Sequence, residues 1–571
     1  MTDAATDSGS NLRSDTSSTG ARNRPTRSLG LSRMADGRVV PSLGRRSRAY
    51  ISGSEVLVSW LGTASVTLLA LFLRLWHLGE PRSFEFDETY YAKDAWSLIH
   101  HGYVTNYVAG ANDKILAGNV DPSLWEKTPS MVVHPEVGKW LIGAGEAVFG
   151  MNPFGWRVAS AVIGSLMILV MIRTARRLTG STILGLAAGL ILCFDGLQLV
   201  LSRLALLDIF QAFFVLCAVS CLIADRDWGR AKLARLAPDG VDPGSWGPVR
   251  GMLFRPWRVL AGVWLGLGLG TKWSTIYVVV AFGLLVWAWD SGARRRLGVD
   301  ASSLKAGVVD ALPAFGWLVL MPAVIYVATW TGWLMHAGVY EQALSHNAYG
   351  PYWGSYVKKP AHGFFPELFR SLRSLWHYHH DVYSFHTGKG LRDSTHVYQS
   401  NPGGWLILNR PVGVDAQLGI KPGEQGCTAP SGSTCLRQVL LLGNPAVWWG
   451  ATLAFIYAIL AWVGRRDWRY GVVVVGVLVT WLPWLKYDDR PIFSYYAIVI
   501  EPFLVLGLVL LLGRILGPAT ASSYRRRVGA IGGGAYLVVV LATFAWFWPI
   551  WTDQLITTPH WLQRIWFHRW I

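Results

Sequence analysis

The sequence is poor in charge and in cysteine. Only 15% of its 571 residues are charged, against 52% that are hydrophobic, which is too apolar and too long for one soluble core. Its five cysteines do not form a metal-binding framework, and its halves show no repeat of the kind that many transporters have. Repeated apolar runs instead predict an all-α polytopic membrane protein, because each crossing takes ~20 apolar residues and backbone groups in lipid must be hydrogen-bonded internally.

The net charge of +17 does not indicate a partner nucleic acid. The Arg residues stand in short clusters between apolar runs, as the positive-inside rule predicts for cytoplasmic loops. The 31 Trp residues, many of them at the ends of apolar runs, fit the aromatic belts of a membrane protein better than a surface for stacking bases. We therefore expect a lipid membrane as the partner and no nucleic acid.

The alternation of apolar runs and Arg clusters predicts about eleven transmembrane helices, with the N-terminus inside and the C-terminus outside. Residues 1–50 are expected to form a disordered basic cytoplasmic tail, and residues 51–571 the membrane domain. No cleavable signal peptide is recognised, so the first span is expected to act as its own insertion signal. The expected spans are 56–78, 154–172, two within 181–224, a hairpin over 259–289, 308–330, 445–463, 470–485, 497–512 and 528–548.

Two long segments fall outside by the parity of the crossings. The acidic segment 80–153 exceeds ordinary loop lengths, which favours a functional loop with short helices of its own. The segment 335–444 is aromatic and rich in His, but its His spacing matches no zinc pattern, so no metal site is expected. Cys427 and Cys435 lie in this second loop, where a disulfide and two free thiols both stay open. The tail from 551 to 571, rich in Trp, is expected along the outer interface.

Asp87 and Glu88 form an acidic pair directly after the first span. A carboxylate beside several bases suits a reaction in which an acceptor hydroxyl loses a proton while an anionic phosphate leaves. The same pair could instead cap a helix over 89–99, and both interpretations stay open on the residues alone. Charges next to spans are costly and indicate function by default. Those expected on the outer side are Asp87, Glu88, His134, Lys139, Arg203, Asp208, Lys272, Lys486, Asp488, Asp489 and Arg490.

Five motifs, in order, resemble those of the actinobacterial protein O-mannosyltransferases. Any one of them alone is a weak signal, whereas the ordered set is specific. The resemblance covers about residues 57–551. The motifs are FDETYYAK from Phe86, HPEVGKW from His134, SRLALLD from Ser202, GTKWS from Gly270 and YSFHTG from Tyr383.

This resemblance implies a GT-C glycosyltransferase fold and the transfer of mannose, with inversion, from a polyprenyl phosphate to Ser or Thr of secreted proteins. It implies Asp87 as the base that deprotonates the acceptor and Glu88 as a supporting residue. Arg203 and Lys272 match basic positions that face the donor phosphate. The further candidates are Arg490 with Tyr495 or Tyr496 for the same phosphate, His134 and Lys139 on the outer-loop motif, and Asp208 and His386.

The resemblance also implies that no cofactor or divalent ion is required, polyprenyl phosphomannose being the donor substrate. The acceptors would be unfolded secretory polypeptides outside the plasma membrane, and association with the Sec translocon stays open. The loop 335–444 is too short for the MIR domain of eukaryotic relatives, and the role of Glu136 stays open because relatives often have a second Pro there. The alternatives are another GT-C transferase acting on a glycan or lipid and, from a different class, a transporter or flippase.

Overall fold

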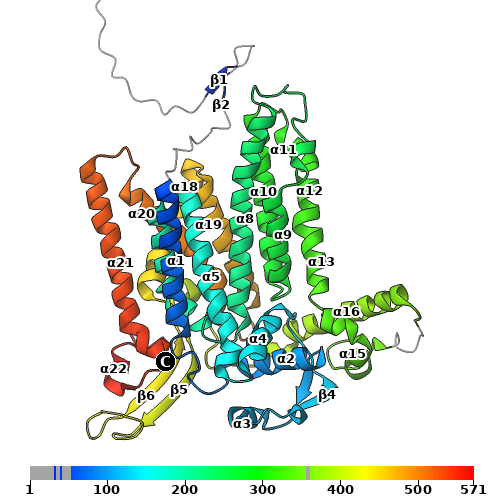
Figure 1. Cartoon of the computed structure of the whole chain (residues 1–571), viewed down its shortest axis with the longest axis vertical. Coiled ribbons are helices and arrows are strands. Elements are labelled where there is room, and N and C mark those ends of the chain that lie inside the picture. The colour runs from blue at the N-terminus through cyan, green and yellow to red at the C-terminus, as the bar shows by residue number, and fades with distance from the viewer. Residues whose placement is uncertain (1–30, 34–38, 42–52, 355–360) are drawn as a thin grey trace, which may run out of the picture.

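The computed structural model describes residues 31–33, 39–41, 53–354 and 361–571. Long helices run side by side through most of the molecule, and the two long loops gather at one end of this bundle (Figure 1). The predicted disordered tail lies largely outside the described residues. Within it, strand β1 (Leu31–Arg33) pairs antiparallel with β2 (Val39–Pro41).

Among the described residues, eight helical segments are long and apolar enough to cross a membrane. Three shorter helices, α6 (Thr182–Cys193), α9 (Pro256–Leu269) and α20 (Glu501–Leu516), pack among them. Together they match the predicted spans, including the hairpin that α9 and α10 form. The number of crossings and their orientation stay predictions. The eight segments are α1 (Gly53–Leu75), α5 (Pro153–Thr179), α8 (Leu207–Leu236), α10 (Thr275–Arg296), α12 (Ala311–Phe315) continued by η3 (Gly316–Leu320) and α13 (Met321–Ala328), α18 (Pro445–Arg465), α19 (Trp468–Trp481) continued by η6 (Leu482–Tyr487), and α21 (Ser523–Trp551).

Helix α8 forms the centre of the bundle. It is apolar on all sides and nearly all of its apolar stretch is buried, as expected for a helix surrounded by other helices. Helices α1 and α21 are mostly exposed at the periphery, which is where a bundle in a membrane meets lipid. Local signals set the helix ends: Asn152 accepts a hydrogen bond from the Gly155 amide at 3.0 Å before α5, and Ser181 accepts one from Leu184 at 3.3 Å before α6.

A buried ionic network ties α8, α9 and α10 together at the end opposite the loops. Arg255 and Arg258 of the α9 start each bridge Asp225 of α8 and Asp290 of α10, with N–O distances from 2.7 to 2.9 Å. Removing one member of a buried pair leaves an uncompensated charge. The network therefore fixes the relative positions of the three helices that carry Asp208 and Lys272 at their other ends.

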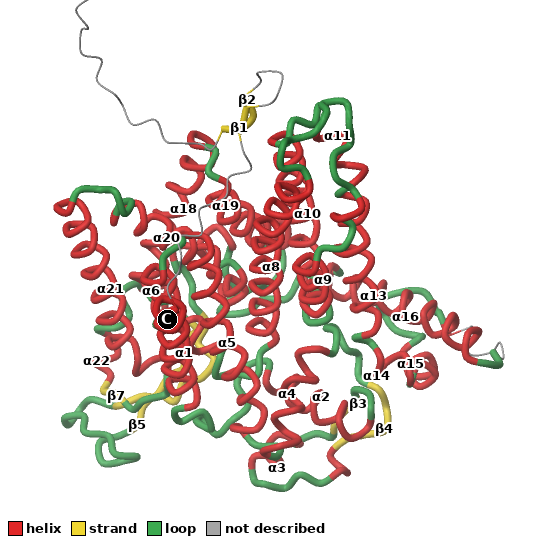
Figure 2. The backbone as a smooth tube through the Cα atoms, turned by 45° about the horizontal axis from the view of Figure 1, so that its top comes forward, coloured by secondary structure: helices red, strands yellow, loops and turns green. Residues whose placement is uncertain are grey.

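The two loops carry secondary structure of their own. In the first, strands β3 and β4 pair antiparallel next to three helices. Apart from β1 and β2, the strands lie at the end of the bundle that carries the loops (Figure 2). The first loop contains α2 (Glu88–His101), β3 (Thr105–Tyr107), α3 (Ala111–Leu116), η1 (Pro122–Leu124), β4 (Trp125–Pro129) and α4 (Val137–Phe149). The second contains α14 (Thr331–Met335), α15 (Ala337–Leu344), α16 (Phe364–Thr387), α17 (Lys389–Arg392), η5 (Pro402–Ile407), β5 (Val412–Ile420) and β6 (Cys435–Leu441).

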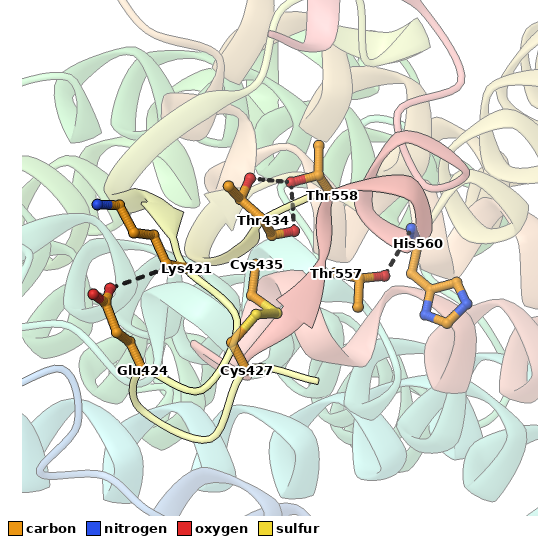
Figure 3. The surroundings of a disulfide bond; sticks show 8 residues. All are labelled: Lys421, Glu424, Cys427, Thr434, Cys435, Thr557, Thr558 and His560. Atoms are coloured by element: carbon orange, nitrogen blue, oxygen red, sulfur yellow. Dashed lines mark hydrogen bonds between the residues drawn. A yellow bond between two sulfur atoms is a disulfide. The ribbon is translucent and has the colours of Figure 1, made fainter. Parts of the chain in front are cut away.

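A three-stranded antiparallel sheet joins the second loop to the end of the chain. Strand β6 lies between β5 and β7 (Ile556–Thr557). Cys427 and Cys435 form a disulfide at the start of β6 (Figure 3), which is one of the two alternatives that the sequence left open. Next to it, the Thr434 and Thr558 hydroxyls lie 3.0 Å apart. The chain therefore closes this loop both covalently and by strand pairing.

Candidate active site

Asp87 stands at the first turn of α2, next to a strained backbone position. Its main-chain oxygen accepts hydrogen bonds from the amides of Tyr90 at 3.0 Å and Tyr91 at 3.1 Å. Within the described residues, its carboxylate makes no capping hydrogen bond to the helix and instead accepts one from the Tyr91 hydroxyl at 3.4 Å. Phe86 has a φ of 51°, a conformation that is costly without glycine and that clusters at functional sites. Main-chain atoms thus start the helix, and the side chain stays available for other contacts.

The surroundings of Asp87 raise its pKa to about 6. Burial is the largest cause, because it penalises the charged form, and the nearby Asp208 carboxylate adds to the increase. The Lys272 ammonium and the Tyr91 hydroxyl oppose it. A carboxyl group with such a pKa is ionised at neutral pH and still basic enough to accept a proton, which suits a general base.

Glu88 points the other way, into the protein. Its carboxylate is fully buried and pairs with the Arg157 guanidinium through two hydrogen bonds, at 2.9 and 2.7 Å. It also accepts the amides of Glu85 at 3.0 Å and Ala205 at 2.8 Å. Arg157 in turn donates to the carbonyls of Pro81 at 2.8 Å and Ser83 at 3.0 Å. This clamp fixes the start of α2 against α5 and against the segment before α8.

Lys272 lies in the turn between α9 and α10, near enough to Asp87 for its charge to act on that carboxylate. Its ammonium contacts both oxygens of Asp208, at 2.9 and 2.8 Å, and stands 5.0 Å from the ring centre of Tyr496. Tyr496 belongs to η7 (Ser494–Val499). The Asp208 carboxylate holds this lysine in place, and the remaining donor capacity of the lysine can meet an anion.

The HPEVGKW segment packs directly against this turn. The Val137 amide donates to the Gly270 carbonyl at 3.1 Å. A side chain at Gly138 would place its Cβ 2.6 Å from the Leu207 side chain, so a larger residue here would require the buried Leu207 side chain to shift. The HPEVGKW and GTKWS motifs are therefore in contact, through a main-chain hydrogen bond and through close packing.

His134, His386 and Arg490 complete the polar surroundings. The two His rings lie 5.8 Å apart, and His134 lies 6.3 Å from Tyr91. Burial lowers the pKa of both, that of His386 to about 4 and that of His134 well below its usual value, and the nearby Lys272 and Arg490 charges add to both effects. Both rings are therefore neutral at neutral pH. In the described part of the chain, Arg490 Nε is buried without a hydrogen-bond partner.

Other predicted site residues are engaged in structural contacts. The Arg203 guanidinium donates to carbonyls at the end of α1, including Arg74 at 3.2 Å and His77 at 3.1 Å. Lys139 is buried against Asp94 at 2.8 Å. Tyr495 is buried, with its ring 5.7 Å from that of Phe86. These residues support the site through their contacts with the surrounding protein.

Glu136, whose role the sequence left open, accepts hydrogen bonds from the first amides of α14. The Gly332 amide lies at 3.3 Å and the Trp333 amide at 3.1 Å from its carboxylate. It thereby connects the first outer loop to the second.

A small pocket opens beside Asp208 between α8, α10 and α19. Its volume of about 20 Å³ is room for about one water molecule. Among its lining residues, Gln211 donates hydrogen bonds to Ser274 at 2.7 Å and to Thr275 at 3.0 Å. Its lining residues are Asp208, Gln211, Ser274, Tyr277, Val278, Val479, Thr480, Pro483, Trp484, Tyr496 and Val499.

Arg157 and Tyr91 are parts of the site that sequence reasoning missed. In the sequence, Arg157 does not differ from other basic residues at the start of a span. The fold places it next to Glu88. Tyr91 stands in the same motif as Asp87, four residues on, which is the spacing at which side chains meet on one face of a helix. That spacing was the available signal.

Comparison with known proteins shows which family the chain belongs to. A family model described as dolichyl-phosphate-mannose-protein mannosyltransferase matches residues 64–237. A polyprenol-phosphate-mannose–protein mannosyltransferase of Mycobacterium tuberculosis H37Rv is 37% identical over 522 residues, which are 90% of this chain and 92% of the relative. The chain belongs to this family. A relative of the same name from Corynebacterium glutamicum is 32% identical over 488 residues, 85% of this chain and 88% of that one.

The fold of this mannosyltransferase family member agrees with a solved structure. The Saccharomyces cerevisiae protein O-mannosyltransferase Pmt1–Pmt2 complex bound to the sugar donor aligns over 90% of this chain and 93% of the compared chain, with a TM-score of 0.61 and 14% identity. Such low identity compares folds alone. This structural similarity confirms the predicted class of a helical, multi-pass membrane protein with the GT-C glycosyltransferase fold.

Proposed function

We propose that this protein transfers mannose from polyprenyl phosphomannose to Ser and Thr hydroxyls of secreted polypeptides, with inversion at the anomeric carbon and Asp87 as the general base. Family membership supports the donor and the reaction. One observation supports the base above all: a carboxylate at the start of α2, turned away from capping its helix and with a pKa of about 6, lies near Lys272. The site opens on the extracytoplasmic face of the plasma membrane in this proposal.

The chemical step needs one base and a stabilised leaving group. The acceptor oxygen forms a bond to the anomeric carbon while the bond from that carbon to the phosphate oxygen breaks. The hydroxyl proton passes to an oxygen of Asp87, and the electron pair of the broken bond stays on polyprenyl phosphate. A positioned base of this kind contributes ~10²–10⁴-fold to a rate.

Lys272 and Arg490 are the groups we assign to the donor phosphate. Asp208 holds the ammonium of Lys272 at 2.8 Å, and the buried Nε of Arg490 lacks a partner in the described residues. An arginine matches phosphate geometry with two parallel hydrogen bonds, and a lysine adds a point charge. Arg203 acts as a positioning residue at the end of α1, and Tyr496 borders both Lys272 and the pocket beside Asp208.

Fixed cations take the place of a divalent ion in this proposal, so the reaction needs no metal. Transfer that is abolished by a chelator and restored by Mn²⁺ or Mg²⁺ would contradict this part. The acceptor in this proposal is an unfolded chain, because a Ser or Thr held within a folded protein cannot be brought to a half-buried base. Emergence of that chain from the Sec translocon would supply it in the required state.

The experiment that tests the proposal measures mannose transfer from polyprenyl phosphomannose to a Ser/Thr-rich peptide by the purified protein. We expect Asp87→Asn to lose ~10²–10⁴-fold in rate and to remain folded. Asp113→Asn, an exposed carboxylate of the same outer loop, is the matched control and should keep full activity. Full activity of Asp87→Asn would remove the assigned base. Product that resists β-elimination would instead favour a glycan or lipid acceptor.

A further inference from the structure

Helix α16 lies across the long helices at the loop end of α13, whereas the helices of the bundle run side by side (Figure 1). Aromatic side chains are exposed along one of its faces. Phe365, Phe369, Trp376 and Tyr383 expose 69%, 66%, 76% and 53% of their surface. Their spacings of four and seven residues keep them on one side of an α-helix. These four residues are called the aromatic face below.

The opposite face of α16 is packed against the protein. Leu375, Tyr378 and Val382 are buried in a cluster with aromatic residues that include Trp330 and Trp333. Ser374 adds a buried hydrogen bond to Glu341. The helix is thus firmly seated on one side, and its aromatic face is the surface that this packing leaves uncovered among the described residues.

The surface next to the aromatic face is the flank of a membrane span. α13 exposes Val324 by 69%, and the stretch of which α13 is part is only 11% buried within the protein. Near the end of α13, Tyr326 is hydrogen-bonded to His379 of α16, and the Trp330 ring lies 4.9 Å from that of His379. The aromatic face therefore continues an apolar surface that faces lipid, at the depth where the span ends.

We propose that α16 is an in-plane membrane helix whose aromatic face is immersed in the interface of the outer leaflet. Trp and Tyr are enriched at this depth, and an amphipathic helix binds there through buried apolar area. Arg373 and His380 are exposed on the same side of α16, three or four residues from Phe369, Trp376 and Tyr383. A long basic side chain such as that of Arg373 can reach lipid phosphates while its stem lies in the apolar layer.

Seating in the membrane would also position the reaction site. The Tyr378 hydroxyl accepts the Val132 amide at 2.5 Å and donates to the Val132 carbonyl at 2.9 Å, two residues before His134. His386 lies in the last turn of the same helix. α16 thus carries His386 itself and holds the main chain two residues before His134. This second part rests on the proposed function, since it links the leaflet that holds the donor to the residues around the donor phosphate.

The first test measures immersion without measuring activity. A cysteine at Phe369, carrying an environment-sensitive fluorophore, is reconstituted into vesicles that contain nitroxide lipids. Leu320→Cys, a 55% exposed position near the middle of the span, and Leu418→Cys, a 67% exposed position of β5, are the deep and aqueous controls. Unmodified protein gives the labelling blank, because its free thiols in the described residues are buried. These thiols are Cys193, Cys217 and Cys221.

We expect the probe at Phe369 to be quenched by a nitroxide near the lipid headgroup, and the probe at Leu418 to be quenched by none. A probe at Phe369 that behaves like the one at Leu418 overturns the proposal. Because the labelled positions are exposed, the variants are expected to fold, and a monodisperse elution profile checks this.

The second test measures the link to the site in proteoliposomes. A double variant with Phe365→Glu and Phe369→Glu should lose about tenfold in kcat/KM for the polyprenyl donor, which corresponds to about 1.4 kcal/mol. The matched double variant with Leu at both positions should keep its activity. Wild-type kinetics in the Glu variant would refute the link. An inactive wild-type protein would instead refute the proposed function, and the quenching result would be unaffected.

Discussion

Glu88→Gln separates a structural carboxylate from a catalytic one. The four hydrogen bonds that Glu88 accepts are divided equally between its oxygens: Oε1 receives Arg157 Nε and the Ala205 amide, and Oε2 receives Arg157 Nη2 and the Glu85 amide. A glutamine of the same shape must point its own NH₂ group at two donors. It also removes the carboxylate that is hydrogen-bonded to the buried Arg157.

The expected cost follows from this geometry. Removal of one partner of a buried ion pair destabilises a protein by ~3–5 kcal/mol. Asp87→Asn, one residue earlier, should cost much less, because the Asp87 carboxylate makes no capping hydrogen bond within the described residues. The same change from carboxylate to amide thus has opposite consequences at adjacent positions: lost stability at Glu88, and lost chemistry at Asp87.

The assay is reversible unfolding of the purified variants in mixed detergent micelles, with transfer activity measured on the folded fraction. We expect the Glu88→Gln protein to unfold at a clearly lower denaturant concentration and its folded fraction to retain substantial activity. A Glu88→Gln protein with wild-type stability and no activity would refute the reasoning, because Glu88 would then take part in the reaction itself.

Three further outcomes are expected. Burial raises the pKa of Asp87 to about 6, so the ionised base is present above that pH and is lost below it. We therefore expect kcat/KM to fall by about tenfold per pH unit under pH 6. A pH profile of kcat/KM that stays flat down to pH 4.5 would exclude this base. Lys272→Ala should weaken donor binding more than Lys272→Arg does, as a titration with polyprenyl phosphate would reveal, and equal affinity in both would remove the assigned phosphate contact. Cys427→Ser should destabilise the β5–β6 region by ~2.5 kcal/mol, the value for a loop of this length, with transfer activity retained; hydrogen exchange of β6 measures the first and the peptide assay the second.

Much of the fold could be predicted because a helix that crosses a bilayer needs a long apolar run, and such runs are visible in the sequence. Apolar runs and Arg clusters mark where helices start and end, and the hairpin around Lys272 followed from Arg clusters at both of its ends. Main-chain capping explains why the helix predicted over 89–99 begins at Glu88 and continues to His101. The pattern of apolar residues does not predict which residues far apart in the sequence pair with each other.

The site illustrates that limit. The sequence placed Asp87, Lys272 and Arg490 together because all are charges next to spans, and the structure brings them into one region. It could not distinguish a guanidinium that faces a ligand from one that caps a helix, and Arg203 makes its contacts with the carbonyls that end α1. Nor could it pair Glu88 with Arg157, because two surface-like charges 69 residues apart meet only when α2 folds back onto α5.

The pairing of β6 with β7 has a consequence for biogenesis. β6 emerges from the ribosome more than a hundred residues before β7, and until β7 arrives one edge of β6 presents unpaired amide and carbonyl groups. The sheet is completed only after α21 has been made, when the Thr434 carbonyl receives the Thr558 amide at 2.9 Å. A nascent chain that stalls before residue 556 would therefore expose an open strand edge at the membrane surface, a signal by which proteases could recognise it as unfinished.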